Sequence, residues 1–204
     1  ERTSQARVTD RIRAGVLEDG TVQLLRDVGL GERMDREGKL HDGTLIAWQD
    51  RAPFLIDTMK YTGRQMMAYG QTAITEDLYR ALERQGGHII DHAAEVRLHD
   101  VATSEPSVTF ARDAVTHRVT CDFIAGCDGF HGVSRHSVPR DITETFEIAY
   151  PFGWLGIMSQ TPPLEDIVYA QHERGFALAS QRSPMLSSPT RPSSAPRIKK
   201  TLVY

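Results

Sequence analysis

The segment of residues 121–135 constrains this chain most, because an apolar run leads directly into a turn rich in glycine and aspartate. Asp128 places a carboxylate in that turn, where it can accept from a sugar hydroxyl or cap backbone N–H groups. Glycine has no Cβ and lets a backbone approach a ligand closely. The segment has three glycines at a spacing of three: Gly126, Gly129 and Gly132.

His131 and Arg135 follow the turn and add donors that suit a pyrophosphate. The competing interpretation is an ordinary strand-to-helix loop, which Gly-Asp-Gly content alone also predicts. The longer string resembles the Asp-Gly motif of the flavoprotein aromatic hydroxylases. The segment therefore raises the hypothesis of a flavin cofactor.

A wider resemblance runs from residue 1 to about residue 183 and points to the same family, class A flavoprotein monooxygenases, in its branch acting on 4-hydroxybenzoate. It is carried by five segments in order along the chain: 11–18, 69–72, 121–135, 151–156 and 175–182. The resemblance implies FAD, NADPH or NADH, and O2 as reactants. It implies hydroxylation of 4-hydroxybenzoate to 3,4-dihydroxybenzoate, a cytoplasmic location and a homodimer for the full-length parent.

Composition excludes several other classes of function. With 204 residues, 40% of them hydrophobic, and a net charge of −3, the chain can bury a core and has no electrostatic reason to bind nucleic acid. No run of 18 apolar residues predicts a membrane span. Cys121 and Cys127 are expected to be small buried hydrophobes, and no His, Cys, Asp or Glu cluster has metal-ligand spacing.

The predicted fold class is α/β, with a partial Rossmann-like FAD-binding domain of the glutathione-reductase type and a mixed β-sheet substrate domain. The chain opens at Glu1 and contains no Gly-x-Gly-x-x-Gly, so the first βα unit and the C-terminal part are expected to be missing. We expect an incomplete FAD-binding domain at 1–149 with inserted β-rich segments, the start of the substrate sheet at 150–182, and a disordered tail at 183–204. The tail has five Ser, four Pro and no acidic residue.

Periodicity predicts the local elements. Apolar residues at helical intervals predict helices over 14–28 and 72–85, the second ending at Gly86. Looser alternation predicts strands over 44–57, broken at Pro53. Further strands are predicted at 88–91, 94–99, 107–111, 116–124 and within 150–182.

Arg11 and Arg13 stand one residue apart before Ala14-Gly15, and two guanidiniums at a helix start make a ready anion site. A solvated basic pair is the alternative. The resemblance implies that they contact the FAD pyrophosphate and that Glu1 binds the FAD ribose. Arg2 is implied to help with the NADPH phosphate. The complete set of implied cofactor residues is Glu1, Arg2, Arg11, Ile12, Arg13, Ala14, Gly15, Val16, Gln71, Asp128, Gly129, His131 and Arg135.

The resemblance also implies a substrate site formed by Tyr169, Ser180, Gln181 and Arg182. Arg182 would pair with the benzoate carboxylate in a planar fork and Ser180 would donate to the same group. Strand alternation predicts that these two side chains share a face. Tyr169 would bind the phenol and draw off its proton. His41 is implied as the outer end of a proton chain to water.

Two other interpretations remain open. The chain could be a catalytically inactive truncated product that binds no FAD tightly. It could also be a flavin-dependent reductase or halogenase that shares the fold, which the implied substrate residues disfavour.

Overall fold

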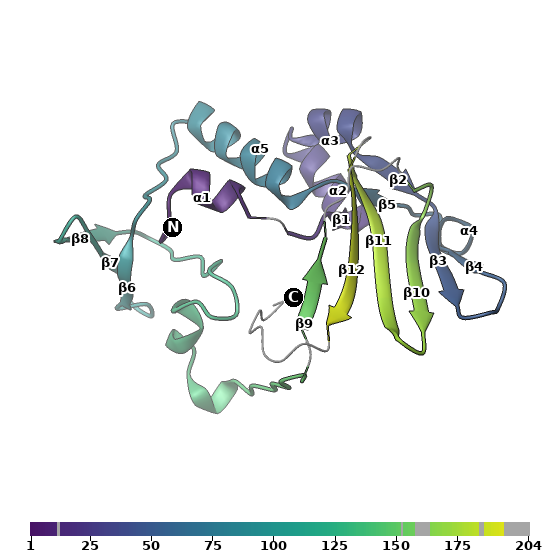
Figure 1. Cartoon of the computed structure of the whole chain (residues 1–204). Helices are drawn as coiled ribbons and strands as arrows, with labels where there is room; N and C mark the ends of the chain where they lie inside the picture. The colour runs from purple at the N-terminus through teal and green to yellow at the C-terminus, as the bar shows by residue number, and fades with distance from the viewer. Residues whose placement is uncertain (12, 152, 158–163, 184–185, 194–204) are drawn as a thin grey trace. The chain divides into compact units, whose positions relative to one another are not determined.

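A computed structural model describes residues 1–11, 13–151, 153–157, 164–183 and 186–193 (Figure 1). The chain divides into two compact units. Unit 1 consists of Glu1–Val8 and His88–Ala149, and unit 2 consists of Thr9–Gly87 and the described chain from Tyr150 onward. Each unit is described by itself. The linear domain boundaries at 149/150 and 182/183 stay a prediction.

The larger sheet of unit 2 has six strands in the order β4-β3-β10-β11-β12-β9 (Figure 1). Their bounds are Gly43–Trp48 (β3), Phe54–Asp57 (β4), Gly153–Gly156 (β9), Ile167–His172 (β10), Gly175–Ser183 (β11) and Leu186–Ser193 (β12). β10 runs parallel to β3 and antiparallel to β11. The sheet is therefore mixed, and the break between β3 and β4 contains Pro53 as predicted.

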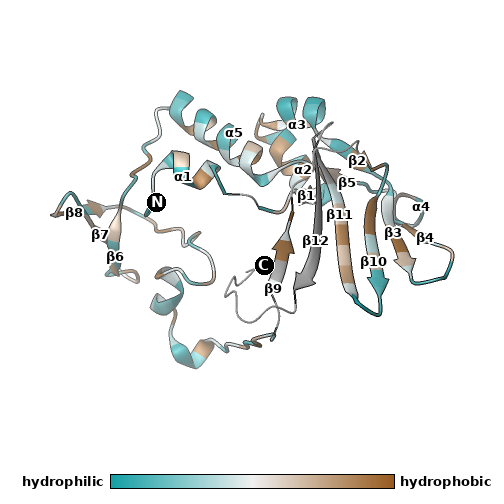
Figure 2. Cartoon of the chain, in the orientation of Figure 1, coloured by the Kyte–Doolittle hydropathy of each residue, from teal (hydrophilic) through white to brown (hydrophobic). Residues whose placement is uncertain are grey.

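The smaller sheet of unit 2 has the order β1-β5-β2, with all pairs antiparallel. Its strands are Val16–Leu17 (β1), Lys39–His41 (β2) and Met66–Ala68 (β5). The helices of unit 2 are α2 (Asp19–Asp27), α3 (Gly31–Glu37), α4 (Thr58–Thr62) and α5 (Gln71–Arg84). Figure 2 shows hydrophilic residues along most of α3 and α5, as expected for helices that cover a core with one face.

Helix α5 confirms the helix predicted over 72–85. Its end is fixed by backbone hydrogen bonds from Gly86 N to Glu83 O and from Gly87 N to Leu82 O, and Gly86 has a φ of 72°. A left-handed glycine just past the last turn is the usual way to satisfy free helix carbonyls. The predicted glycine stop is therefore confirmed.

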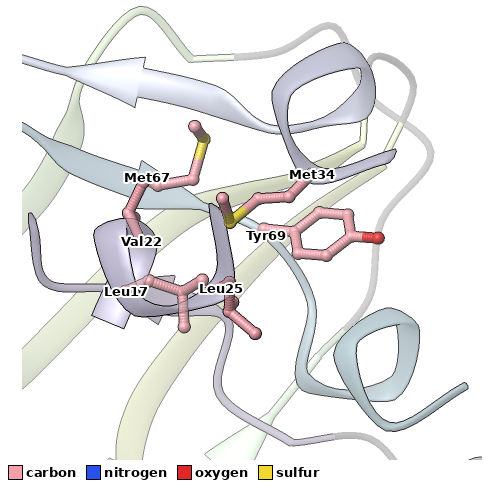
Figure 3. Close-up of a cluster of buried hydrophobic side chains, with 6 residues drawn as sticks. All are labelled: Leu17, Val22, Leu25, Met34, Met67 and Tyr69. Carbon is pink, nitrogen blue, oxygen red and sulfur yellow. The ribbon is translucent and has the colours of Figure 1, made fainter. Parts of the chain in front are cut away.

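The core of unit 2 lies between the small sheet and its helices (Figure 3). Met34 is fully buried, and Met67 is 2% exposed. The remaining members of the cluster are Leu17, Val22, Leu25 and Tyr69, with Leu30, Ala73 and Ile74 packed against them. Strand β1, helices α2, α3 and α5, and strand β5 thus share one apolar interior.

Unit 1 contains an antiparallel sheet of β6 (Ala94–His99), β7 (Ser107–Arg112) and β8 (Val115–Thr120). Helix α1 (Gln5–Thr9) and the short 3-10 turns Ser134–Ser137 and Arg140–Ile142 complete the described elements that lie in or next to it. None of the helices in the described part of the chain is long and apolar enough to cross a membrane. The same residues hold no group of three or more potential metal ligands.

Three local predictions differ from the structure. The helix predicted over 14–28 begins only at Asp19, because Val16 and Leu17 pair with β5 as a strand. The strand predicted at 88–91 is not formed, and the strand predicted over 116–124 ends at Thr120. A strand needs a neighbouring backbone, and apolar composition does not supply one.

The predicted disordered tail also differs. Within 183–204 the structure has strand β12, which pairs with β11 on one side and β9 on the other. Two neighbouring strands provide hydrogen-bond partners that the Ser- and Pro-rich composition does not reveal. Residues 184–185 and 194–204 lie outside the described residues.

We expect Met34→Ala to destabilise unit 2 by about 2–5 kcal/mol, because truncating a fully buried side chain leaves a cavity. The control is Met59→Ala on α4, where the side chain is 44% exposed and the expected change is within about 0.5 kcal/mol. Urea unfolding monitored by circular dichroism measures both. Equal losses in the two variants would contradict the assignment of the core.

Candidate functional site

The predicted anion-binding segment lies against the N-terminus of α5. The backbone N–H of Gln71 donates to Ala14 O at 3.3 Å, and the Thr72 hydroxyl donates to Arg11 O at 3.2 Å. The guanidiniums of Arg11 and Arg13 belong to exposed residues. These contacts place the paired arginines beside the start of a 14-residue helix.

The helix whose N-terminus lies beside Arg11 and Arg13 is α5, not the helix predicted over 14–28. The sequence predicts a helix over 14–28 that starts at Ala14-Gly15, but Gly15 leads into strand β1. Gly15 is buried, and its carbonyl accepts from Tyr69 N at 2.8 Å. Val16, the next residue, is 39% exposed, whereas Leu17 faces the core.

The start of α5 fits the pyrophosphate of FAD. Its N-cap, Gly70, provides no side-chain cap to the first turn. Free N–H groups at a helix N-terminus attract an anion, and guanidiniums add charge-assisted hydrogen bonds. Arg11, Arg13, Ala14, Gly15 and Gln71 are thus brought together. Ile12 lies outside the described residues.

The Asp-Gly turn of unit 1 is organised around Asp128. Its carboxylate accepts from the Ser134 backbone N–H at 3.0 Å and from the Ser134 hydroxyl. The hydroxyl hydrogen bond, followed by the backbone hydrogen bond, lowers the pKa of the exposed Asp128 carboxyl. Of the two roles predicted for Asp128, the structure contains the backbone cap.

Two glycines of this turn serve its own packing. A Cβ on Gly132 would meet the Asp128 carboxylate, and a Cβ on Gly126 would meet the Ser134 side chain. Only at Gly129, with a φ of 76°, does the space around a Cβ stay open within 4 Å of the described residues. The sequence predicts that all three glycines let a ligand approach the backbone. At Gly126 and Gly132 the space is instead occupied by side chains of the same turn.

The basic residues after the turn face their own loop. Arg135 donates to Phe130 O at 2.8 Å and to Thr145 Oγ1 at 3.1 Å, and its guanidinium lies 4.1 Å from the Phe130 ring centroid. His131 contacts the edge of the same ring. Arg135 must exchange these contacts to bind a phosphate, whereas His131 is exposed.

Glu1 is held by the chain around it, although a first residue is expected to fray. Its amino group donates to Ile90 O at 2.8 Å, and its carbonyl accepts from Ala93 N. Burial raises the pKa of its carboxyl, but hydrogen bonds from Thr3 outweigh that effect and leave the pKa lowered. Arg2 is exposed. The ribose and NADPH roles of both residues stay predictions.

The six-stranded sheet brings together part of the predicted substrate site. Tyr169 on β10 lies opposite Leu178 on β11, and Ser180 is two residues further along the same strand. Alternation along β11 therefore places Ser180 on the face that carries Tyr169. Tyr169 is 39% exposed and packs edge-on against Phe176, whereas Ser180 is 2% exposed.

Gln181 and Arg182 have only their backbone described. The pairing of β11 with β12 shifts register between Gln181 and Ser183, the position of Arg182. A bulge interrupts regular alternation and is a common way to redirect one side chain. The predicted common face of Ser180 and Arg182 stays a prediction.

His41 occupies a buried position at the end of β2. It is 2% exposed, and its Nδ1 lies 3.0 Å from Glu165 O, so Nδ1–H donates and Nε2 is left as an acceptor. Nε2 is buried with no hydrogen-bond partner among the described residues. Burial lowers the pKa of His41, and the charge of Lys39 acts in the same direction. The predicted outer, solvent end of a proton chain is therefore an interior position.

A polar network behind the α5 N-terminus was missed by the sequence analysis. Tyr69 is 4% exposed and donates its hydroxyl hydrogen to Asp77 Oδ2 at 2.7 Å. Arg33 on α3 pairs with the other oxygen of Asp77 at 3.1 Å and with Glu76 at 3.0 Å. The spacing of eight residues between Tyr69 and Asp77 crosses a strand end, so no periodicity predicts their contact.

The predicted cofactor residues divide between the units. Unit 1 contains Glu1, Arg2, Asp128, Gly129, His131 and Arg135, and unit 2 contains Arg11, Arg13, Ala14, Gly15, Val16 and Gln71. The substrate residues Tyr169 and Ser180 and the histidine His41 all belong to unit 2.

Helices combine with one mixed and two antiparallel sheets in the described residues, so the predicted α/β fold class of a flavoprotein is confirmed. A family model described as an FAD binding domain matches residues 1–198, so the chain belongs to that family.

The family resemblance is confirmed by a named relative. The chain is 44% identical over 185 residues to the p-hydroxybenzoate hydroxylase of Acinetobacter baylyi, covering 90% of this chain and 45% of the relative. The chain thus spans about half of that relative's length.

Two solved structures share the fold. The p-nitrophenol 4-monooxygenase PnpA from Pseudomonas putida DLL-E4 has a TM-score of 0.77 at 13% identity, covering 98% of this chain and 52% of that chain. The flavin-dependent halogenase CmlS has a TM-score of 0.70 at 18% identity, covering 94% of this chain and 36% of that chain.

We expect the stability of unit 2 to fall as the pH drops below about 6.5, the ordinary pKa of histidine. The unfolded chain then binds a proton at His41, whereas the folded chain keeps the imidazole neutral because its pKa is lowered. His41→Asn, which keeps a donor for Glu165 O, should lose this component. Exposed His136→Asn is the control. Urea midpoints at pH 5.5 and 7.5 that change equally in wild type and His41→Asn would contradict the burial of His41.

Proposed function

We propose that this chain forms the FAD-binding and substrate-binding part of an aromatic monooxygenase that hydroxylates 4-hydroxybenzoate to 3,4-dihydroxybenzoate with NAD(P)H and O2. The observation that carries the proposal is the 44% identity over 90% of the chain to a p-hydroxybenzoate hydroxylase. The proposed substrate residues Tyr169 and Ser180 lie on neighbouring strands of unit 2, and the proposed cofactor residues are divided between the two units. A cytoplasmic location and a homodimeric parent remain part of the same prediction.

Arg11 and Arg13, with the start of α5, would hold the FAD pyrophosphate. Gly15 and Val16 would supply backbone near the flavin, and Gln71 would make a further contact from the first residue of α5. Asp128 and Gly129 in unit 1 would contact the rest of the cofactor. Glu1 would bind the FAD ribose, Arg2 would help to bind the NADPH phosphate, and His131 and Arg135 would offer donors to a pyrophosphate. When bound, FAD supplies the redox chemistry that activates oxygen.

The chain's own part in the chemistry is to orient the substrate and move one proton. Arg182 and Ser180 would bind the benzoate carboxylate, with Gln181 beside them on β11. Tyr169, which is partly exposed, would contact the phenol and draw off its proton, so that the ring becomes a better nucleophile. The acceptor Nε2 of His41 suits a later position in the same proton chain.

Two rival functions are separated by the same measurements. A catalytically inactive chain predicts no flavin uptake, and a halogenase or reductase predicts no hydroxylated product. The structure of CmlS is 18% identical to this chain and therefore supports the shared fold alone.

A hybrid enzyme tests the proposal. The matched stretch of the Acinetobacter relative is replaced by this chain's residues, and the rest of the relative is kept. We expect a yellow protein whose NADPH oxidation is stimulated by 4-hydroxybenzoate and yields 3,4-dihydroxybenzoate. Changing both Arg11 and Arg13 to Gln should weaken FAD binding, whereas the same change at exposed Arg51 and Arg84 should not. A colourless, folded hybrid would refute the proposal.

In that hybrid we expect Tyr169→Phe to keep substrate binding and to lower hydroxylation by about 10²-fold or more, because the phenol loses its positioned proton acceptor. The product formed per NADPH oxidised is measured by chromatography. Tyr150→Phe, an exposed tyrosine at the start of the second part of unit 2, is the control. Equal product yields from Tyr169→Phe and the parent hybrid would remove Tyr169 from the proton path.

A further inference from the structure

We propose that Tyr69 is a positioning residue for the candidate FAD site, because it ties the arginine segment and the start of α5 to one buried point. This inference rests on the proposed function for its ligand. The residue joins two parts of the site through two different groups. Its backbone N–H donates to Gly15 O at 2.8 Å, and its hydroxyl donates to Asp77 Oδ2 at 2.7 Å.

The first connection fixes the arginine segment. Gly15 lies two residues after Arg13 and four residues after Arg11. The carbonyl of its neighbour Ala14 accepts from Gln71 N at 3.3 Å. The hydrogen bonds of Tyr69 N and Gln71 N thus flank Gly70, the uncapped N-cap of α5. Any shift of Tyr69 moves the paired arginines and the helix start together.

The second connection fixes α5 along its axis. Asp77 lies in the second turn of the helix, and its side chain is only 13% exposed. Arg33 holds the second carboxylate oxygen, so the acceptor of the Tyr69 hydroxyl is itself oriented from α3. Hydrogen bonds with one charged partner are shorter and stronger than neutral ones. A phenylalanine at position 69 would fill the same space in the core but could not donate the hydrogen bond to Asp77.

The restraint holds over the ordinary pH range. Burial, and then the hydrogen bond to Asp77, raise the pKa of the Tyr69 hydroxyl well above its ordinary value. The hydroxyl therefore remains a donor.

Hydrogen exchange on the 204-residue chain tests the role without any cofactor. In Tyr69→Phe we expect amide exchange to accelerate at least about tenfold in peptides covering 9–18 and 66–74, the scale of one lost charge-assisted hydrogen bond. Peptides covering β10 and β11 should be unchanged. The control is Tyr61→Phe, an exposed tyrosine on α4.

Two changes at Asp77 separate positioning from general stability. Asp77→Asn keeps an oxygen acceptor for Tyr69 but loses the carboxylate charge and the ion pair with Arg33, so exchange near the site should rise by less than in Tyr69→Phe. Asp77→Ala should reproduce Tyr69→Phe, and the double variant should be no worse than either. Exchange that rises equally in β10 and β11, or that matches Tyr61→Phe everywhere, would overturn the proposal.

FAD titration by flavin fluorescence gives the second readout. Where the wild-type chain binds FAD, the dissociation constant should rise about tenfold in Tyr69→Phe and by less than that in Asp77→Asn. Unchanged affinity in Tyr69→Phe would overturn the link to the cofactor. A wild-type chain that takes up no FAD counts against the proposed function, while the exchange result still decides whether Tyr69 positions the segment.

Discussion

The burial of Met34, Met67 and Tyr69 in one apolar cluster is the interaction on which the candidate site of unit 2 depends. The cluster joins the strands β1 and β5 to the helices α2, α3 and α5. The segment with Arg11 and Arg13 leads into β1, and the N-terminus of α5 follows directly after β5 in the chain. Because close-packed interiors resist small displacements, both halves of the anion site inherit their position from this core.

The two candidate sites use different kinds of restraint. The candidate pyrophosphate site consists of backbone groups and two exposed arginines, and hydrogen bonds to Gly15 O and Ala14 O hold its segments together. The substrate site lies on a mixed sheet, where Tyr169 and Ser180 share a face because their strands pair antiparallel. Sheet pairing holds side chains at regular spacings on each face of the sheet.

The residues of the Asp-Gly turn serve the turn itself before any ligand. Asp128 holds Ser134, Gly132 leaves room for that carboxylate, and Arg135 covers Phe130. These contacts hold the turn in one conformation in the structure, and a preorganised site loses less entropy on binding. The same residues can therefore have a structural role in the free chain and a binding role in the holoprotein.

Sequence alone determined the elements whose signals are local. Residue types at short spacings predict the helix α5 with its glycine stop and the strands β3, β4, β6 and β7. The sequence also shows directly that Arg11 and Arg13 stand one residue apart. The resemblance then supplied the family. Tertiary structure decided the rest, because partners far apart in the chain have no local signature.

That difference explains each departure. Val16 and Leu17 became a strand because β5 lies beside them, and residues 186–193 became a strand because β11 and β9 offer hydrogen-bond partners. His41 is buried, and its Nδ1 meets the carbonyl of Glu165, which lies 124 residues later in the chain. The contact of Tyr69 with Asp77 likewise exists only once a strand end and a helix pack on the same core. Local sequence sets what each segment can become, and long-range packing selects which of those states is formed.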